Sequence, residues 1–196
     1  YHDDSETEPF RTEEMHSENG VWKAKVSGDL SGVYYTYAFT RNGNTAETID
    51  IYARSAGVNG RRGMVLDLRT TDPEGWERDR QVALGDYTDA VIYELHVRDF
   101  SSDESGNFTL RGKFGAFCEK AVNGFGETIG LDYIKKLGVT HIHLLPVSDY
   151  QSVDESDPDA GFNWGYDPLN YNIPEGSYST DPHHGEVRVR EFKQLI

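Results

Sequence analysis

The stretch Ala90–Val97 (AVIYELHV) decides the fold, together with two segments that follow it. It is an apolar run with little alternation, which suits a strand buried on both faces of a parallel sheet. Glu127–Leu137 (ETIGLDYIKKL) carries apolar residues at helical spacing and ends at Gly138, a typical helix stop. Val139–Val147 (VTHIHLLPV) is a second apolar strand. This strand–helix–strand order predicts a parallel α/β sheet or barrel.

The N-terminal part follows a different pattern, with short alternating runs separated by Gly, Asn, Asp and Ser. Such runs are typical of antiparallel strands, and here they predict a β-sandwich. The runs are Val21–Val26, Val33–Phe39, Glu47–Ala53 and Met64–Leu68.

A segment with neither a helical nor a strand period lies between the two patterns. It contains Asp72-Pro73 and Glu74-Gly75, which are turn signals. We therefore predict a β-domain over residues 1–70, a linker over 71–86 and an α/β domain over 87–196.

The stretch Ser148–Glu186 contains no long periodic element, and it precedes an expected helix over Val187–Ile196. Loops of this length inside compact domains are usually functional. Aromatic residues alternate in it with acids, and flat rings with carboxylate acceptors suit a carbohydrate. The alternative is that the rings only pack the loop onto the domain. The aromatics are Tyr150, Phe162, Trp164, Tyr166, Tyr171 and Tyr178, and the acids are Asp149, Asp154, Glu155, Asp157, Asp159, Asp167 and Glu175.

Several other residues could carry chemistry but have a structural alternative. His141 and His143 share one strand face, yet no third metal ligand accompanies them, so we expect them to fill the domain interior or to pack under helices. Alternation also places Glu94, His96 and Arg98 on one side of their strand, where they could form a buried polar network. The single cysteine, Cys118, has no evident catalytic partner.

Composition excludes several classes of protein. The 196 residues carry 34 acidic and 19 basic side chains, a formal net charge of −15, which disfavours binding to nucleic acid. No apolar run approaches the roughly 20 residues of a membrane span. One cysteine excludes an internal disulfide framework.

Three stretches read together resemble the type I pullulanases, the debranching enzymes of glycoside hydrolase family 13. They are Ala90–Ser101, Gly138–Tyr150 and Phe162–Tyr178. The most specific part is Asn163–Pro168 (NWGYDP), which is similar to the YNWGYDP signature of those enzymes with Phe162 in the place of the tyrosine. A family 48 carbohydrate-binding module is resembled by three further stretches, Gly20–Trp22, Tyr34–Tyr37 and Asn59–Leu68. That module typically reads DPYA where this chain has Asp50–Ala53, with Ile51 in the place of proline.

The resemblance implies an immunoglobulin-like β-sandwich, incomplete at its start, followed by the first part of a (β/α)8 TIM barrel. That part would hold strands 1 and 2, helix 1, the long loop and the start of helix 2. The implied activity is retaining hydrolysis of α-1,6 branch links in pullulan, amylopectin and limit dextrins. The alternatives are a non-catalytic α-glucan-binding fragment and an isoamylase-like or α-amylase-like enzyme.

The resemblance also assigns residues. Tyr166 matches the tyrosine that stacks on the sugar at subsite −1, Asp167 an acid beside it, and Trp164 and Asn163 the same pocket wall. The nucleophile, the acid/base and the stabilising acid match no residue here, so this chain alone is expected to be inactive and to be part of a larger enzyme. The remainder of that enzyme, as the same or a second chain, is the expected partner besides α-glucan.

No cofactor is expected to be required. Acid-rich loops also suit calcium, but no EF-hand-like ligand spacing occurs, so no metal ligand is assigned. Starch is too large to enter a cell, which favours a secreted or cell-surface enzyme, whereas imported dextrins would allow a cytoplasmic one.

Overall fold

The predicted strand–helix–strand unit is present in the computed structural model, which describes residues 1–196. Strand β7 (Ile92–Leu95) pairs in parallel with β10 (His141–Leu144), with Ile92 opposite His141 and Leu95 opposite Leu144. The connection between them contains helix α1 (Leu131–Lys136). It also contains the small hairpin of β8 (Ala121–Val122) and β9 (Thr128–Ile129). The expected helix Glu127–Leu137 is therefore too long, because Thr128–Ile129 pair as a strand and Gly130, at φ +72°, lies between that strand and α1.

The prediction that both strands are buried on their two faces is wrong in this structure. Ile92 is 65 % exposed and Tyr93 is 39 % exposed. His141 and His143 are also exposed, rather than inside the domain. The reason is that β7 and β10 pair only with each other, so the sheet is too narrow to be covered by layers on both sides.

The N-terminal part forms short antiparallel strands, as predicted, but residues 49–53 and 65–68 of the expected runs are not strands. Each strand pairs with a single partner. Strands β1 (His16–Glu18) and β2 (Val21–Lys23) form one hairpin, β4 (Tyr37–Arg41) and β5 (Asn44–Thr48) another, and β3 (Tyr34–Tyr35) pairs with β6 (Gly63–Met64). Both hairpins turn at Asn-Gly pairs with positive φ, as two-residue turns require. The sandwich itself is not confirmed, because these ladders do not join into sheets.

The stretch expected to lack periodic structure contains an unpredicted hairpin. Strand β11 (Ser148–Tyr150) lies antiparallel to β12 (Pro168–Pro174), with register shifts on both sides of Asp149. The expected C-terminal helix is present as α2 (Gly185–Leu195). Seven 3-10 turns complete the chain: η1 (Val58–Gly60), η2 (Leu68–Thr71), η3 (Trp76–Arg78), η4 (Tyr87–Asp89), η5 (Phe114–Cys118), η6 (Pro158–Ala160) and η7 (Gly176–Tyr178).

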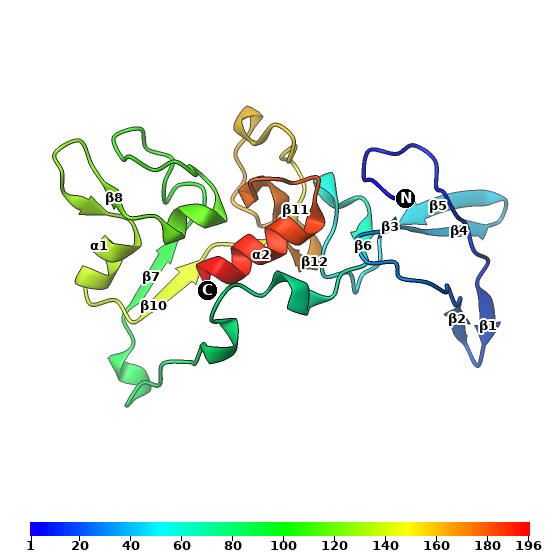
Figure 1. Cartoon of the computed structure of the whole chain (residues 1–196), viewed down its shortest axis with the longest axis horizontal. Coiled ribbons are helices and arrows are strands. Elements are labelled where there is room, and N and C mark those ends of the chain that lie inside the picture. Colours follow the sequence, from blue (N-terminus) through cyan, green and yellow to red (C-terminus); the bar gives the residue numbers. More distant parts are fainter.

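The molecule is elongated, with the N-terminal hairpins at one end and α1 and β8 at the other (Figure 1). Helix α2 lies in the middle, beside β11 and β12. The largest apolar cluster also lies here. It joins Val97, two positions after β7, to η5 and the long loop. Its buried members are Val97, Phe114, Phe117, Tyr150 and Tyr178. No helix has the length and apolar composition needed to cross a membrane.

The centre of the molecule is organised by Arg188 of α2, whose side chain is fully buried. Its guanidinium donates two hydrogen bonds to the Glu155 carboxylate, at 3.1 and 2.7 Å. It also donates to the carbonyl oxygens of Pro174 at 3.2 Å, Gly57 at 3.1 Å and Pro182 at 3.0 Å. One side chain therefore ties η1, β12, the loop at Glu155 and α2 together.

Two further buried carboxyls, Asp149 and Glu175, complete what we call the Arg188 cluster (Arg188, Asp149, Glu155 and Glu175). Burial, followed by the charges of Glu155 and Glu175, raises the pKa of Asp149 to about 8. Burial and the charge of Glu155 raise the pKa of Glu175 to about 7. One guanidinium cannot balance three carboxylates, so protonation of these two groups stabilises the folded protein.

Replacing Arg188 with Met is expected to lower the free energy of unfolding by about 3–5 kcal/mol, because it leaves buried carboxylates without a positive partner. Chemical denaturation followed by circular dichroism measures the change. The matched control is Arg190→Met, since Arg190 lies on the exposed face of the same helix. A loss no larger than that of the control would contradict the role given to Arg188.

The Arg188 cluster also predicts a pH dependence of stability. In the unfolded chain Asp149 and Glu175 ionise near their ordinary pKa values of 3.8 and 4.5. A raised pKa in the folded state means that the stabilising contribution is complete at low pH and is lost as the pH rises through about 7 to 8. Asp149→Asn should flatten the decline in stability between pH 6 and 8 in denaturation curves.

The control for this pH series is Asp79→Asn, which makes the same substitution at an exposed position outside the Arg188 cluster. Equal pH slopes in the wild type and in Asp149→Asn would refute the assignment. A calcium-dependent rise in stability at pH 8 would instead indicate that a cation balances the Arg188 cluster.

Candidate functional site

The predicted sugar-binding residues lie on one segment, Phe162–Asp167, which enters β12. The carbonyl oxygen of Asn163 lies 3.0 Å from Nε2 of His96, the residue that follows β7 by one position. The segment is therefore held at the carboxyl end of the parallel strand pair, the side on which α/β folds place their sites.

Asn163 and Asp167 bond to each other and close the segment into a turn. The Asn163 amide donates to an Asp167 carboxylate oxygen at 2.7 Å and to the carbonyl oxygen of Gln151 at 2.6 Å. Its side-chain oxygen accepts from the Gly165 amide at 2.8 Å, and Ser152 donates to Asp167 at 2.8 Å. Both predicted site residues thus shape the segment through their own hydrogen bonds.

The turn requires glycine at position 165. Its φ is +85°, and a Cβ there would lie 3.0 Å from both the Cβ and the carbonyl oxygen of Pro146. A side chain would therefore be strained by its backbone conformation and by contact with the loop after β10.

The carboxylate of Asp167 is in its charged form near neutral pH. The loss of some hydration acts to raise its pKa, but hydrogen bonds from Ser152 and Asn163 outweigh this and hold the pKa of Asp167 below its usual value. A charged acceptor strengthens both hydrogen bonds, so Asp167 acts as the anchor of the turn.

The aromatic residues of the segment face outward. Tyr166 is 71 % exposed and Trp164 is 56 % exposed. The Trp164 ring stands edge-on to Phe162 with 5.6 Å between the ring centroids. Large rings exposed on a rigid turn can present flat apolar faces to a ligand. We call Phe162, Trp164 and Tyr166 the aromatic platform.

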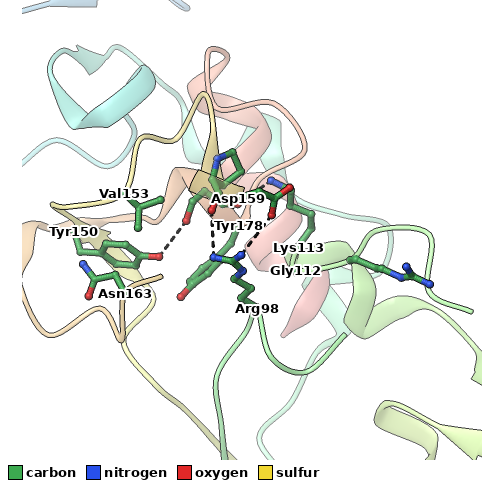
Figure 2. Close-up of a pocket in the computed structure, with 11 residues that line it drawn as sticks. Arg98, Gly112, Lys113, Tyr150, Val153, Asp159, Asn163 and Tyr178 are labelled. Atoms are coloured by element: carbon green, nitrogen blue, oxygen red, sulfur yellow. Dashed lines mark hydrogen bonds and ion pairs between the residues drawn. The ribbon is translucent and has the colours of Figure 1, made fainter. Parts of the chain in front are cut away.

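A small cavity lies behind the segment (Figure 2). It has a volume of about 60 Å³, and its lining includes Arg98, Lys113, Tyr150, Asn163 and Tyr178. Ligand pockets usually enclose about 300–1,000 Å³, so this cavity cannot enclose a sugar ring. A ligand of that size could contact only the exposed surface of the segment, where the aromatic platform lies.

Arg98 and Lys113 in this cavity are already engaged with the backbone. Arg98 donates to the carbonyl oxygens of Pro158, at 3.2 Å, and Gly161. Lys113 donates to the carbonyl oxygen of Ser177 at 2.8 Å. The two cations therefore hold the loops around the segment in place.

The predicted network of Glu94, His96 and Arg98 does not form. Only His96 is buried, whereas Glu94 is exposed and lies 3.2 Å from His143. Arg98 points to the loop at 158–161. The cause is that β7 ends at Leu95, so the alternation of the strand does not continue to Arg98.

The acids of the long loop separate into two groups. Asp154, Asp157, Asp159 and Asp167 are exposed, whereas Asp149, Glu155 and Glu175 are buried in the Arg188 cluster. One oxygen from each of these three buried groups lies within 4.8 Å of the others, a spacing that could hold a metal ion. Arg188 already supplies positive charge there, at 2.7 Å from Glu155.

The sequence did not single out Arg188, whose partners are as many as 131 residues away. No local sequence pattern identifies such a contact, because Arg188 is one of several charged residues in a polar helix.

Cys118, for which the sequence offered no catalytic partner, donates to the carbonyl oxygen of Gln194 at 3.3 Å. This contact agrees with a structural role.

Known proteins match the chain strongly. No protein-family model matches, but the pullulanase of Bacillus subtilis strain 168 is 42 % identical over 180 residues, or 91 % of this chain and 24 % of that protein. A solved pullulanase from Paenibacillus barengoltzii, mutant D470A complexed with maltotetraose, is 46 % identical with a TM-score of 0.95, covering all of this chain and 31 % of that one. Isoamylase 1 of rice is 26 % identical over 223 residues, or 98 % of this chain and 26 % of that protein.

The chain spans less than a third of the length of these relatives. The pullulanases match it at higher identity than the isoamylase does, which confirms the resemblance carried by the sequence motifs. The chain is therefore a homologue of one segment of the pullulanases.

Proposed function

We propose that this chain forms part of a glycoside hydrolase that cleaves α-1,6-glucosidic links in pullulan, amylopectin and limit dextrins with retention. The observation that carries the proposal is the aromatic platform, which is exposed on a turn fixed by Asn163 and Asp167. A relative that shares this segment was solved with maltotetraose. Tyr166 would stack on a glucosyl ring, and Trp164 would form the wall beside it.

In this proposal the chain contributes substrate binding but no catalytic acid. Retaining glycosidases need two carboxyl groups about 5–5.5 Å apart on either side of the scissile bond. The clustered carboxyls Asp149, Glu155 and Glu175 are buried and are held by backbone amides and Arg188. They cannot reach a substrate, so the chain alone should not hydrolyse glucan.

We further propose that the remainder of a (β/α)8 barrel covers the exposed sheet of β7 and β10, as the same or a second chain. Residues 87–196 would be the start of that barrel, after a family 48-like sandwich at 1–70 and a linker at 71–86. The exposed apolar side chains of Val91, Ile92 and Tyr93 support this arrangement, because a parallel strand is normally covered on both faces.

No metal is assigned a part in the reaction. The Arg188 cluster lies inside the fold, so any calcium bound there would stabilise the structure rather than meet the substrate. The size of starch supports secretion or surface display of the whole enzyme.

A segment exchange tests the proposed function. In the Bacillus subtilis pullulanase, the 180 matched residues are replaced by those of this chain to give the segment-exchange enzyme. We expect it to release reducing ends from pullulan but not from amylose, whereas the chain alone releases none from either. A folded segment-exchange enzyme that binds pullulan without hydrolysing it would favour the glucan-binding alternative.

Within the segment-exchange enzyme, Tyr166→Ala is expected to lower kcat/KM for pullulan by roughly tenfold or more, because the stacking ring is lost. Tyr166→Phe keeps the ring and should retain most of the activity. The matched control is Tyr171→Ala on β12, since Tyr171 is 75 % exposed but lies outside the aromatic platform. Equal losses in the two alanine variants would argue against the stacking role.

A further inference from the structure

His96 is a buried histidine for which the proposed reaction gives no role. Its side chain is only 4 % exposed, and it lies between the end of β7 and the segment that carries the aromatic platform. Nε2 lies 3.0 Å from the carbonyl oxygen of Asn163 and 3.0 Å from the hydroxyl of Tyr178. Since a carbonyl oxygen only accepts, Nε2 carries the hydrogen.

The imidazole ring also contacts the platform directly. Its centroid lies 5.2 Å from that of Phe162, in a tilted arrangement, and 6.3 Å from that of Trp164, edge to face. Tyr178 meets the ring edge-on at 5.8 Å from another side. His96 therefore contacts the rings of Phe162 and Trp164 as well as the backbone carbonyl of Asn163, which lies between them in the sequence.

The remaining ring nitrogen shows that packing alone does not explain a histidine here. Nδ1 is buried and has no hydrogen-bond partner, and the closest carboxylate oxygen, of Asp99, is 3.9 Å away. An unsatisfied buried acceptor costs stability, which an apolar side chain would avoid. The hydrogen bond from Nε2 to Asn163 is the interaction that a histidine gains and an apolar side chain lacks.

We propose that His96 is a positioning residue for the aromatic platform. Its hydrogen bond fixes the carbonyl of Asn163, and its ring sets the tilt of Phe162 and Trp164. The orientation of Tyr166 follows, because the Asn163–Asp167 turn is closed by its own hydrogen bonds. The positioning role does not depend on the proposed function. Only the expected effect of His96 on glucan hydrolysis rests on that function.

Two substitutions distinguish the aromatic ring of the imidazole from its hydrogen-bond donor. His96→Phe keeps an aromatic ring but removes the donor, whereas His96→Gln keeps a donor that can reach a carbonyl. The control is His143→Phe, because His143 is an exposed histidine on the neighbouring strand β10. Thermal unfolding of each variant identifies any general loss of stability.

The first readout is hydrogen–deuterium exchange of the 196-residue chain, which needs no activity. We expect the amide of Gly165 to exchange roughly three- to tenfold faster in His96→Phe, the size of effect that loss of one hydrogen bond produces. His96→Gln and His143→Phe should exchange like the wild type. Exchange that is unchanged in His96→Phe, or equally raised in His96→Phe and His96→Gln, would overturn the proposal.

The second readout is kinetic and uses the segment-exchange enzyme. His96→Phe should raise KM for pullulan several-fold with a smaller change in kcat, and His96→Gln should restore KM. If the unmutated segment-exchange enzyme is inactive, the proposed function fails, while the exchange measurement still decides the role of His96. A parallel loss of kcat and stability in both His96 variants would indicate a packing role only.

Discussion

The burial of a single positive charge is the constraint on which this structure depends. Arg188 can lie inside the protein only if its charge is balanced and most of its donors are matched. Nη1 and Nη2 donate to Glu155 and to carbonyl oxygens from three separate segments, whereas Nε is buried without a partner. Each segment must therefore approach the same point. The long loop is ordered around this point, beyond the β11–β12 hairpin, because carbonyl oxygens of Pro174 and Pro182 accept from the guanidinium and Glu155 supplies a counter-charge.

A short series of contacts connects the Arg188 cluster to the aromatic platform at the surface. The Tyr150 amide donates to Glu175 of the Arg188 cluster, and the Tyr150 hydroxyl lies 3.1 Å from Ser177. Tyr150 also packs against Tyr178, which in turn contacts His96 and through it the aromatic platform. The exposed rings can thus hold a fixed orientation without being buried themselves.

Sequence patterns predicted the parts of this structure that depend on neighbours along the chain. The strand in the run at 90–97 and the helix before Gly138 both follow from local spacing. Both are present over shorter ranges than expected, Ile92–Leu95 and Leu131–Lys136. Pairing between distant strands is not encoded locally, so the sandwich was expected where the structure has separate hairpins. The hairpin of β11 and β12 was missed for a related reason, since its register shifts at Asp149 break the alternation.

The same distinction applies to the candidate site. The motif at 163–168 marks residues that form a turn, and the structure explains the spacing: the Asn163 amide reaches Asp167 four positions later only because Gly165 adopts a positive φ between them. What the motif does not specify is the support beneath the turn, because His96 lies 67 residues earlier in the chain. A sequence pattern can therefore identify the exposed rings proposed to bind a sugar, while it leaves unmarked the residues proposed to determine their orientation.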